Sequence, residues 1–405
     1  MEEWIEYKLG DIAQMKYGKM PKLSANGLFP VWSGYRYAGF SDEMNCPKGT
    51  LIVVARGVGG TGDVKIATTD CFLTNLSISV NLNKQICNPL FLYYKFRIKN
   101  LKYLDSGSAQ SQITIDDLKR LCIQLPPLKK QEELISFLKS LDDKIEVNRR
   151  INDNLEQQAQ ALFKSWFVDF EPFKDGEFVE SELGMIPKGW RVGKYDDIIE
   201  STISGDWGKE NPEGNYTHKV ACIRGCDFQD IKNGLRGKTP ERYILEKNFQ
   251  TKHFKDKDIL VEISGGTATV STGRVCPVSQ LLIDKFNADI VCTNFCRLVR
   301  PMRNYGAYLY YSWLYKYNNK VMFGYENGTS GIKNFRIKDF TALEPVVIPS
   351  EEALLSFQSM IDKLQMKLQM NGSESQKLAT LRDTLLPKLM SGELKVNDMR
   401  LSEKQ

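Results

Sequence analysis

Residues 129–167 constrain the fold most, because they contain no glycine or proline and follow the pair Pro126-Pro127. Apolar side chains recur there at alternating spacings of three and four residues, the heptad pattern of a helix that packs along another helix. These positions are Leu134, Leu138, Leu141, Ile145, Leu155, Ala159, Leu162 and Trp166, with Asn148 and Asn152 on the seam between them. Polar seam residues fix register at a cost in stability. We expect a helix roughly 55–60 Å long.

A second stretch near the C-terminus supplies a partner for this helix. From Glu351 the same spacing returns, again with a polar middle at Asn371 and Ser375. The apolar positions are Leu354, Phe357, Ile361, Leu364, Leu368, Leu378, Leu381 and Leu385. Gly372 weakens a helix by up to ~1 kcal/mol relative to alanine. An interruption of the second helix at residues 371–373 is therefore an open alternative.

The two helices belong to an internal repeat. Ser136-Phe137 matches Ser356-Phe357, and residues 9–12 after Trp4 parallel residues 195–198 after Trp190. Gly107-Ser108 before residues 115–118 likewise parallels Gly328-Thr329 before residues 337–340. The chain thus consists of a globular module plus a long helix, written twice. A pseudo-two-fold axis across equivalent helices makes them antiparallel and predicts one module at each end of the pair. The alternative is that each helix packs back on its own module.

Composition limits the class of protein. The 405 residues suggest two or three domains, and 42% hydrophobic residues suffice for packed cores. The sequence has no leader-like start and no apolar run near eighteen residues, so we expect a soluble, cytoplasmic protein. Nine cysteines without a secretion signal are expected to be reduced thiols. A net charge of +5 permits a polyanionic partner without requiring one.

These observations predict an α+β fold in which two domains of mixed sheet and short helices are joined and separated by two long antiparallel helices forming a coiled coil. Strand-like runs occupy residues 51–55, 76–80, 122–125 and 258–263, and short buried helices are expected at 89–96 and 306–314. The polar residues 169–189 are interpreted as a connector. The predicted parts are a first domain (1–128), a first helix (129–168), connector and second domain (169–349), a second helix (350–392) and a polar tail (393–405).

Glycine-rich segments do not indicate a nucleotide site. Residues 57–62 satisfy the G-x-G-x-x-G string after a strand, but the dinucleotide site requires a helix next. The strand-like residues 63–67 follow instead, so we predict a tight loop between strands. Ser264-Gly265-Gly266-Thr267 occupies the same place in the second module. Residues 234–239 end like a Walker loop but lack its first glycine.

No catalytic constellation is found. The only histidines, His218 and His253, make a His-based triad or zinc hydrolase site improbable. Cys222, Cys226, Cys292 and Cys296 could form a zinc site, but their spacing is looser than usual knuckles and their surroundings are strand-like, so buried thiols are preferred. The base-methylation motif Asn/Asp-Pro-Pro-Tyr is absent, and Asp258 and Glu262 lack a following lysine at nuclease spacing. We therefore predict no catalytic residues and no bound metal.

Cations and aromatic residues scattered in loops are the remaining candidates. Basic, glycine-containing loops suit phosphate contacts, and polar side chains can read base edges in a major groove. The competing interpretation is that they are ordinary solvated surface charges. As a set they favour DNA binding, and they are Lys16, Lys19, Lys22, Tyr35, Arg36, Arg56, Lys209, Arg224, Arg236, Lys238 and Arg274.

Four stretches together resemble the specificity subunit of type I restriction–modification systems. They are residues 125–145, residues 161–170, residues 184–190 and residues 381–394. The resemblance covers essentially the whole chain, although the modules are the divergent parts of that family. Residues 371–373 depart from the family pattern.

The resemblance implies that each module reads half of an asymmetric, bipartite site in double-stranded DNA, while the helices set the spacer and dock two modification subunits. Those partners would carry S-adenosylmethionine and methylate adenine N6, and two restriction subunits would add ATP- and Mg-dependent translocation and cleavage. This chain would bind no cofactor. We predict a helix or partner interface at Leu134, Leu138, Leu141, Ile145, Asn148, Asn152, Leu155, Leu162, Trp166, Phe357, Ile361, Leu364, Leu368 and Leu378. The alternatives are a stand-alone methyltransferase or nuclease, and a protein-binding assembly scaffold.

Overall fold

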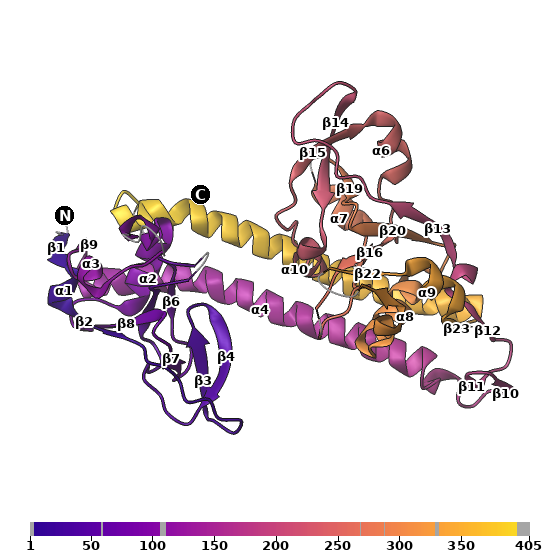
Figure 1. The fold of residues 1–405 in the computed structure, drawn as a ribbon, viewed down its shortest axis with the longest axis horizontal. Helices are drawn as coiled ribbons and strands as arrows, with labels where there is room; N and C mark the ends of the chain where they lie inside the picture. The colour runs from indigo at the N-terminus through magenta and orange to yellow at the C-terminus, as the bar shows by residue number, and fades with distance from the viewer. Residues whose placement is uncertain are drawn as a thin grey trace, which may run out of the picture. The chain divides into compact units, whose positions relative to one another are not determined.

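The structure, a computed structural model, describes residues 4–57, 60–105, 111–267, 269–286, 288–328 and 332–394. The chain divides into two compact units (Figure 1). The first unit comprises residues 1–144 and 378–405, and the second comprises residues 145–377. Gly107-Ser108 and Thr329 of the predicted repeat, and residues 395–405 of the predicted tail, lie outside the described residues.

Both predicted long helices are present. α4 runs from Leu128 to Phe167 and α10 from Glu351 to Ser391. α10 is continuous through residues 371–373, so an interruption at these residues is wrong. A Cβ atom on Gly372 would lie 2.4 Å from the carbonyl oxygen of Gly234. This glycine therefore lets a loop of the second unit pack directly against the helix.

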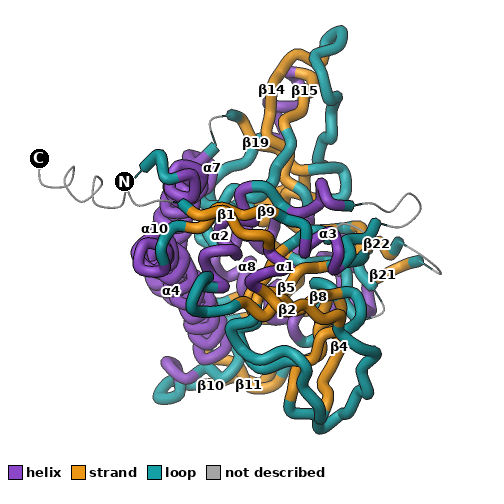
Figure 2. The backbone as a smooth tube through the Cα atoms, turned by 90° about the vertical axis from the view of Figure 1, so that its left-hand side faces the viewer, coloured by secondary structure: helices purple, strands orange, loops and turns teal. Residues whose placement is uncertain are grey.

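In the second unit α4 and α10 pair through their polar seam residues, side by side in both backbone views (Figures 1 and 2). The hydrogen bonds join Asn148 Nδ2 to Glu374 Oε2 (2.7 Å) and Ser375 Oγ (3.3 Å), Asn371 Nδ2 to Asn152 Oδ1 (2.9 Å), and Asn152 Nδ2 to Leu368 O (3.1 Å). Rising numbers on α4 meet falling numbers on α10, which confirms the antiparallel coiled coil. In the first unit the ion pair between Asp142 of α4 and Arg382 of α10 fits the same antiparallel arrangement of the helices. The neighbouring Leu381, predicted on the seam, is instead 46% exposed.

The helix ends are also part of the module cores. Each long helix therefore both pairs with the other helix and packs on a module, so the two arrangements are not alternatives. In the first unit α4 and α10 contribute Leu134, Ile135, Leu138, Leu386, Leu389 and Met390 to the core. In the second they contribute Ala159, Phe163, Phe167, Ala353, Leu354, Phe357 and Ile361. The buried rings of Phe163 and Phe167 fall beside the predicted seam positions Leu162 and Trp166, which are only partly buried. The apolar stripe is therefore wider at the helix ends than a coiled-coil seam.

The main sheets confirm the internal repeat, because their strand orders match. The first unit has the order β2-β8-β5-β6 and the second β13-β20-β16-β18, with neighbouring strands antiparallel. The strands are β2 (Ala13–Tyr17), β8 (Ser77–Leu82), β5 (Leu51–Val54), β6 (Val64–Ile66), β13 (Ile199–Ser204), β20 (Cys296–Pro301), β16 (Ile259–Glu262) and β18 (Val275–Pro277). β6 follows the glycine string 57–62, so no helix begins there, although Val58 and Gly59 lie outside the described residues.

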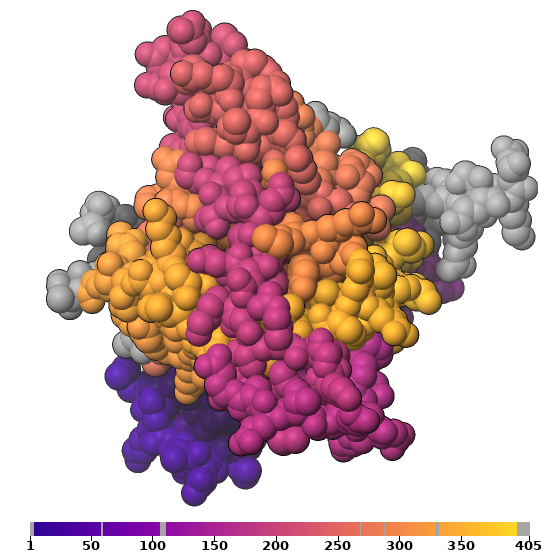
Figure 3. All heavy atoms as spheres, turned by 90° about the vertical axis from the view of Figure 1, so that its right-hand side faces the viewer, coloured from indigo at the N-terminus to yellow at the C-terminus, as the bar shows by residue number. Residues whose placement is uncertain are grey.

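A smaller sheet is also repeated. Its order is β4-β3-β7 in the first unit and β15-β14-β19 in the second, with the central strand antiparallel to one neighbour and parallel to the other. The strands are β3 (Phe29–Ser33), β4 (Arg36–Ser41), β7 (Phe72–Leu73), β14 (Tyr216–Ile223), β15 (Glu241–Leu245) and β19 (Asp289–Cys292). In the second unit β14, β15 and α6 (Glu246–Lys252) lie in the pink and salmon projection at the top of Figure 3.

The remaining elements of the repeat occur in the same order in both units. β1 (Ile5–Lys8) pairs with β9 (Cys122–Leu125), and β12 (Arg191–Lys194) pairs with β23 (Pro345–Ile348). The helical pairs are α1 (Leu9–Ile12) with η3 (Tyr195–Asp197), α2 (Pro89–Ile98) with α8 (Gly306–Asn318), and α3 (Ile115–Lys119) with α9 (Ile337–Leu343). The other elements are α5 (Phe228–Lys232), α7 (Gln280–Lys285), β17 (Ser264–Gly265), β21 (Glu326–Asn327), β22 (Lys333–Phe335), η1 (Leu101–Leu104), η2 (Glu171–Phe173), η4 (Gly225–Asp227) and η5 (Val321–Tyr325).

The predicted connector has more structure than its composition suggested. β10 (Phe178–Ser181) and β11 (Gly184–Pro187) form an antiparallel hairpin within residues 169–189. Ile186 and Trp190 are buried in the second core, where the Trp190 ring lies 5.8 Å from that of Phe167. Among the described residues no helix is both long and apolar enough to span a membrane.

Candidate nucleic-acid interface

Four loops meet beside the small sheet in each unit, and we call this region the loop edge. In the first unit the loops follow β2, β3, β5 and β7, and in the second they follow β13, β14, β16 and β19. Matching backbone hydrogen bonds hold them together. Lys19 N donates to Leu73 O (3.0 Å) as Asp206 N donates to Cys292 O (2.8 Å), and Ala55 N donates to Leu76 O (2.8 Å) as Ile263 N donates to Phe295 O (2.9 Å).

The close approach of these loops requires glycine at one equivalent position. A Cβ atom on Gly18 would lie 2.2 Å from Leu73 O, and one on Gly205 would lie 2.0 Å from Thr293 O. Neither approach is possible for a larger residue without moving the backbone. The two loop edges therefore share one backbone design, and the side chains that they carry can be compared position by position.

At the first loop edge and in the adjoining strands β4 and β6, cations lie over aromatic rings. The guanidinium carbon of Arg36 is 5.7 Å from the centre of the Tyr35 ring, and that of Arg56 is 5.9 Å from the Tyr17 ring. Lys65 Nζ lies 5.9 Å from both the Trp32 and the Tyr35 rings. Among the described residues Arg36, Arg56 and Lys65 form no ion pair. Their charges are thus available to an anionic partner, and the rings orient them.

Sequence reasoning placed most of these residues and missed Lys65. Burial lowers the pKa of the Lys65 ammonium, with an opposing contribution from Asp63. Lys65 lies in β6, within residues 63–67, whose strand-like sequence was used only as an argument against a nucleotide-binding loop. Its position beside Trp32 depends on tertiary structure, which the sequence does not reveal. Lys16 lies within β2 rather than in a turn, and its side chain is exposed. Lys19 and Lys22 are exposed in the loop after β2.

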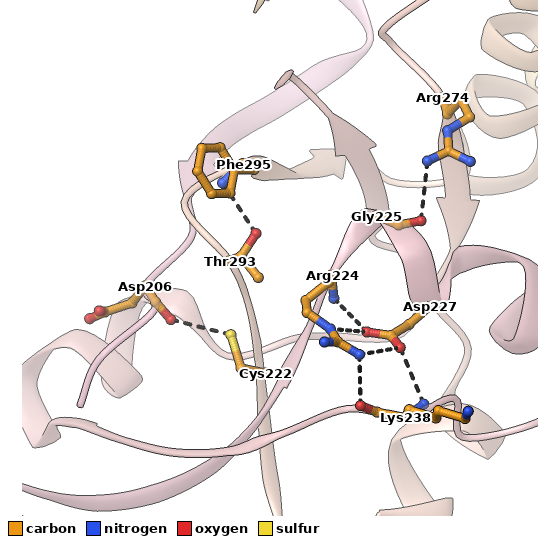
Figure 4. A network of polar contacts seen from close by, with 9 residues as sticks. All are labelled: Asp206, Cys222, Arg224, Gly225, Asp227, Lys238, Arg274, Thr293 and Phe295. Atoms are coloured by element: carbon orange, nitrogen blue, oxygen red, sulfur yellow. Dashed lines mark hydrogen bonds and ion pairs between the residues drawn. The ribbon is translucent and has the colours of Figure 1, made fainter. Parts of the chain in front are cut away.

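The second loop edge carries arginines that are held by carboxylates, and Figure 4 shows the pair formed by Arg224 and Asp227. Arg224 Nε and one terminal nitrogen donate to the two oxygens of the buried Asp227 at 3.0 and 3.1 Å, and the same terminal nitrogen donates to Lys238 O at 2.8 Å. Arg274 donates in the same two-pronged manner to the buried Glu262 at 2.7 and 2.8 Å. These hydrogen bonds raise the pKa of both guanidinium groups. Their charge is therefore largely balanced within the chain.

A cavity of about 430 Å³ opens between these pairs. Its lining residues are Trp207, Arg224, Gly225, Cys226, Glu262, Ser264, Thr293, Asn294 and Phe295. Arg242 stacks on Trp207 with its guanidinium carbon 3.8 Å from the ring centre, and the Phe295 side chain is 62% exposed. The structure thus brings Arg224 and Arg274 into one network, which Lys238 joins only through its backbone, together with aromatic residues that the sequence had not singled out.

The other two predicted cations of the second unit lie in different settings. Lys209 Nζ pairs with Glu213 at 3.4 Å and lies 5.8 Å from the Tyr216 ring. The guanidinium carbon of Arg236 lies 4.9 Å from the Phe286 ring. Neither contacts the arginine–carboxylate pairs in the described part of the chain.

Three of the four candidate zinc cysteines are buried in this unit, and His218 is held by carboxylates. Cys222, Cys292 and Cys296 are buried, and burial raises the pKa of the Cys222 and Cys296 thiols to about 12 and that of Cys292 well above its ordinary value. Cys226 is exposed, which corrects its prediction as a buried thiol. The two ring nitrogens of His218 contact Glu246 Oε2 (2.5 Å) and Asp289 Oδ2 (2.8 Å).

The predicted helix-interface residues differ in how deeply they are buried. Leu134, Leu138, Asn148, Asn152, Phe357, Ile361 and Leu368 are buried, whereas Leu141, Ile145, Leu155, Leu162, Trp166, Leu364 and Leu378 are partly buried. The buried members have no surface to offer another protein. Exposed apolar side chains of the same helices include Val147, Ile151, Met366 and Met370.

Comparisons with known proteins agree with this architecture. The family described as "Type I restriction modification DNA specificity domain" matches residues 1–157. The chain is 29% identical to the type I restriction enzyme MjaIX specificity subunit of Methanocaldococcus jannaschii, over 87% of this chain and 79% of that protein. It is 26% identical to the HindI specificity subunit of Haemophilus influenzae, over 97% of this chain and 100% of that protein.

The fold is also found in a solved structure. The type I restriction–modification S subunit from M. genitalium aligns with a TM-score of 0.54 and 19% identity, over 96% of each chain. That likeness supports the fold, and the two sequence relatives support the family across most of the chain. A module repeated with a long helix after each copy is thus similar, along most of its length, to the specificity subunits of type I restriction enzymes.

Proposed function

We propose that each loop edge reads one half of an asymmetric, bipartite DNA site and that the paired helices set the spacer between the halves. The observation that carries this proposal is the repeated loop edge, built on one backbone design but carrying different side chains. A subunit that recognises two different half-sites needs such a pair. The chain is a specificity subunit and is non-catalytic, and the activities of the enzyme reside in other subunits.

Type I specificity subunits function with other subunits and with DNA, and we propose a particular composition for this complex. Two modification subunits would bring S-adenosylmethionine and methylate adenine N6, and two restriction subunits would bring ATP- and Mg-dependent cleavage. This chain would bind none of these cofactors. The buried seam cannot dock a partner, so we assign docking of the modification subunits to the exposed apolar residues Val147, Ile151, Met366 and Met370 of the second unit.

The test of recognition is methylome sequencing of a host that carries this chain with its modification partner. One bipartite motif with a fixed spacer is expected. Steep loss of DNA affinity with salt, through counterion release, distinguishes DNA recognition from a protein scaffold. Salt-independent or absent DNA binding in the assembled complex would favour the scaffold.

The spacer role is tested by removing seven residues from α4 together with a matched seven from α10, which preserves the heptad. The helix pair then shortens by ~10.5 Å, and the recognised spacer should shorten with it. The control replaces the same seven-residue segments without changing their length. An unchanged spacer in the deletion variant would contradict the proposal.

The docking surface is tested with the double substitution Met366→Glu and Met370→Glu. Both side chains are exposed, so folding should be retained. Binding of the modification subunit should weaken, as measured by co-purification and calorimetry. A matched change on the exposed polar face, Lys363→Glu, should leave binding intact. Equal binding by all three proteins would exclude this surface.

A further inference from the structure

The same short turn ends the parallel strand of the small sheet in each unit. It contains Thr74-Asn75-Leu76 after β7 and Thr293-Asn294-Phe295 after β19. The two turns carry the same threonine–asparagine pair. Sequence reasoning missed it, although aligning the two modules would have revealed it.

Hydrogen bonding shows that the two turns are equivalent. Thr74 N donates to Trp32 O and Thr293 N donates to Ile223 O, both at 3.0 Å. One residue past each asparagine the backbone N–H donates to the threonine hydroxyl, at 3.4 Å from Leu76 and at 3.2 Å from Phe295 (Figure 4). Ser77 N and Cys296 N then donate to the threonine carbonyls at 3.1 and 2.9 Å. The buried threonines thus hold the turn in both units.

The asparagine side chains have no role in holding these turns. Asn75 and Asn294 are both exposed, and no hydrogen bond of either carboxamide is present among the described residues. Neither residue has a positive φ, so the backbone does not call for asparagine. A carboxamide is therefore presented at an equivalent point of each loop edge. Asn294 borders the cavity with Arg224 and Phe295, and Arg56 N donates to Leu76 O (3.2 Å) beside Asn75.

The chemistry of this group fits one base best. A carboxamide carries a donor and an acceptor side by side, and the major-groove edge of adenine presents the complementary N7 acceptor and N6 amino donor. We propose that Asn75 and Asn294 are specificity-determining residues, each of which pairs with an adenine in the half-site read by its own unit. This inference rests on the proposed function and names a base contact within it.

The test uses the full chain assembled with its modification subunit. The variants are Asn75→Ala, Asn75→Asp, Asn294→Ala and Asn294→Asp, and each pair serves as the matched control for the other. Methylation of duplexes carrying every single-base change in each half-site gives the sequence preference. Asn75 variants should lose discrimination at one adenine of one half-site by about 10- to 100-fold, and Asn294 variants at one adenine of the other half-site. Aspartate should be as poor as alanine, because it lacks the donor.

The outcomes separate the two proposals. Relaxation at one position of one half-site, with melting temperatures unchanged, supports the assignment. An unchanged preference, a uniform loss of affinity without a change in preference, or relaxation of both half-sites by one variant would overturn it while leaving bipartite recognition in place. If the wild-type complex showed no bipartite preference, the proposed function itself would fail.

Discussion

The two loop edges share a backbone design but differ in how they carry charge. Trp32 and Ile223 are equivalent, because each accepts the backbone hydrogen bond of the matching threonine. Four residues further along the chain, the first unit has Arg36 and the second has Asp227. The first edge displays cations over aromatic rings without ion pairs among the described residues, whereas the second holds its arginines against buried carboxylates. The difference indicates that one scaffold supports two kinds of reader, one through free charge and one through fixed, balanced arginines beside aromatic side chains.

The largest expected effect is the loss of stability that follows from removing the Asp227 carboxylate of the second loop edge. Asp227 is buried and accepts hydrogen bonds from Arg224 and from the backbone of Lys238. Asp227→Ala should lower the free energy of unfolding of the second unit by about 3 kcal/mol, measured by urea titration, because it leaves Arg224 without its buried partner. The matched change Arg36→Ala removes an exposed side chain and should cost less than ~0.5 kcal/mol. If Asp227→Ala and Arg36→Ala lowered the free energy of unfolding equally, the proposed difference between the two loop edges would be wrong.

A smaller effect is expected on DNA affinity. Arg56→Ala should weaken binding by the assembled complex by about 1–2 kcal/mol, because an available guanidinium is removed. The paired change Arg274→Gln with Glu262→Gln should change nonspecific binding much less, since it removes an ion pair that carries no net charge. Calorimetry on nonspecific duplex DNA compares the two variants. Greater weakening by the paired Arg274→Gln and Glu262→Gln change than by Arg56→Ala would contradict the proposed difference between the two loop edges.

The smallest effect is a pH dependence from Lys65. Burial lowers the pKa of this lysine in the free protein, and a phosphate nearby would favour its charged form and raise the pKa again. Binding should then take up protons, and affinity should fall as the pH rises through the free-state pKa of Lys65. The dependence should be reduced in Lys65→Met. NMR can follow the pKa of Lys65 directly. If this pKa did not rise on DNA binding, no phosphate would lie beside Lys65 in the complex.

How far each feature could be predicted depends on the range of the interactions that determine it. The limits of α4 and α10 follow from a local heptad and the surrounding prolines, and the alternation of residues 76–80 indicated β8. Gly372 was misread because its role is to admit the loop at Gly234, which is distant in sequence. The hairpin within residues 169–189 was hidden by a polar composition.

The candidate site was less predictable for the same reason. The Arg274–Glu262 pair depends on β16 and β18 lying side by side, and the position of Lys65 beside Trp32 depends on the packing of two sheets against each other. Propensity and spacing carry no information on such long-range neighbours. The Thr-Asn turn was readable in principle, because it is a property of the repeat rather than of three-dimensional packing.

The most direct measurement of the central claim is the salt dependence of nonspecific DNA binding by the assembled complex. The triple variant Arg36→Ala, Arg56→Ala and Lys65→Ala should reduce the slope of log K against log salt by roughly 0.9 for each phosphate that is no longer neutralised, up to ~2.7. The charge-neutral variant Arg224→Gln, Asp227→Asn, Arg274→Gln and Glu262→Gln removes both ion pairs without changing the net charge and should leave the slope nearly unchanged. Similar reductions in the two variants, or a reduction only in the second, would contradict the account.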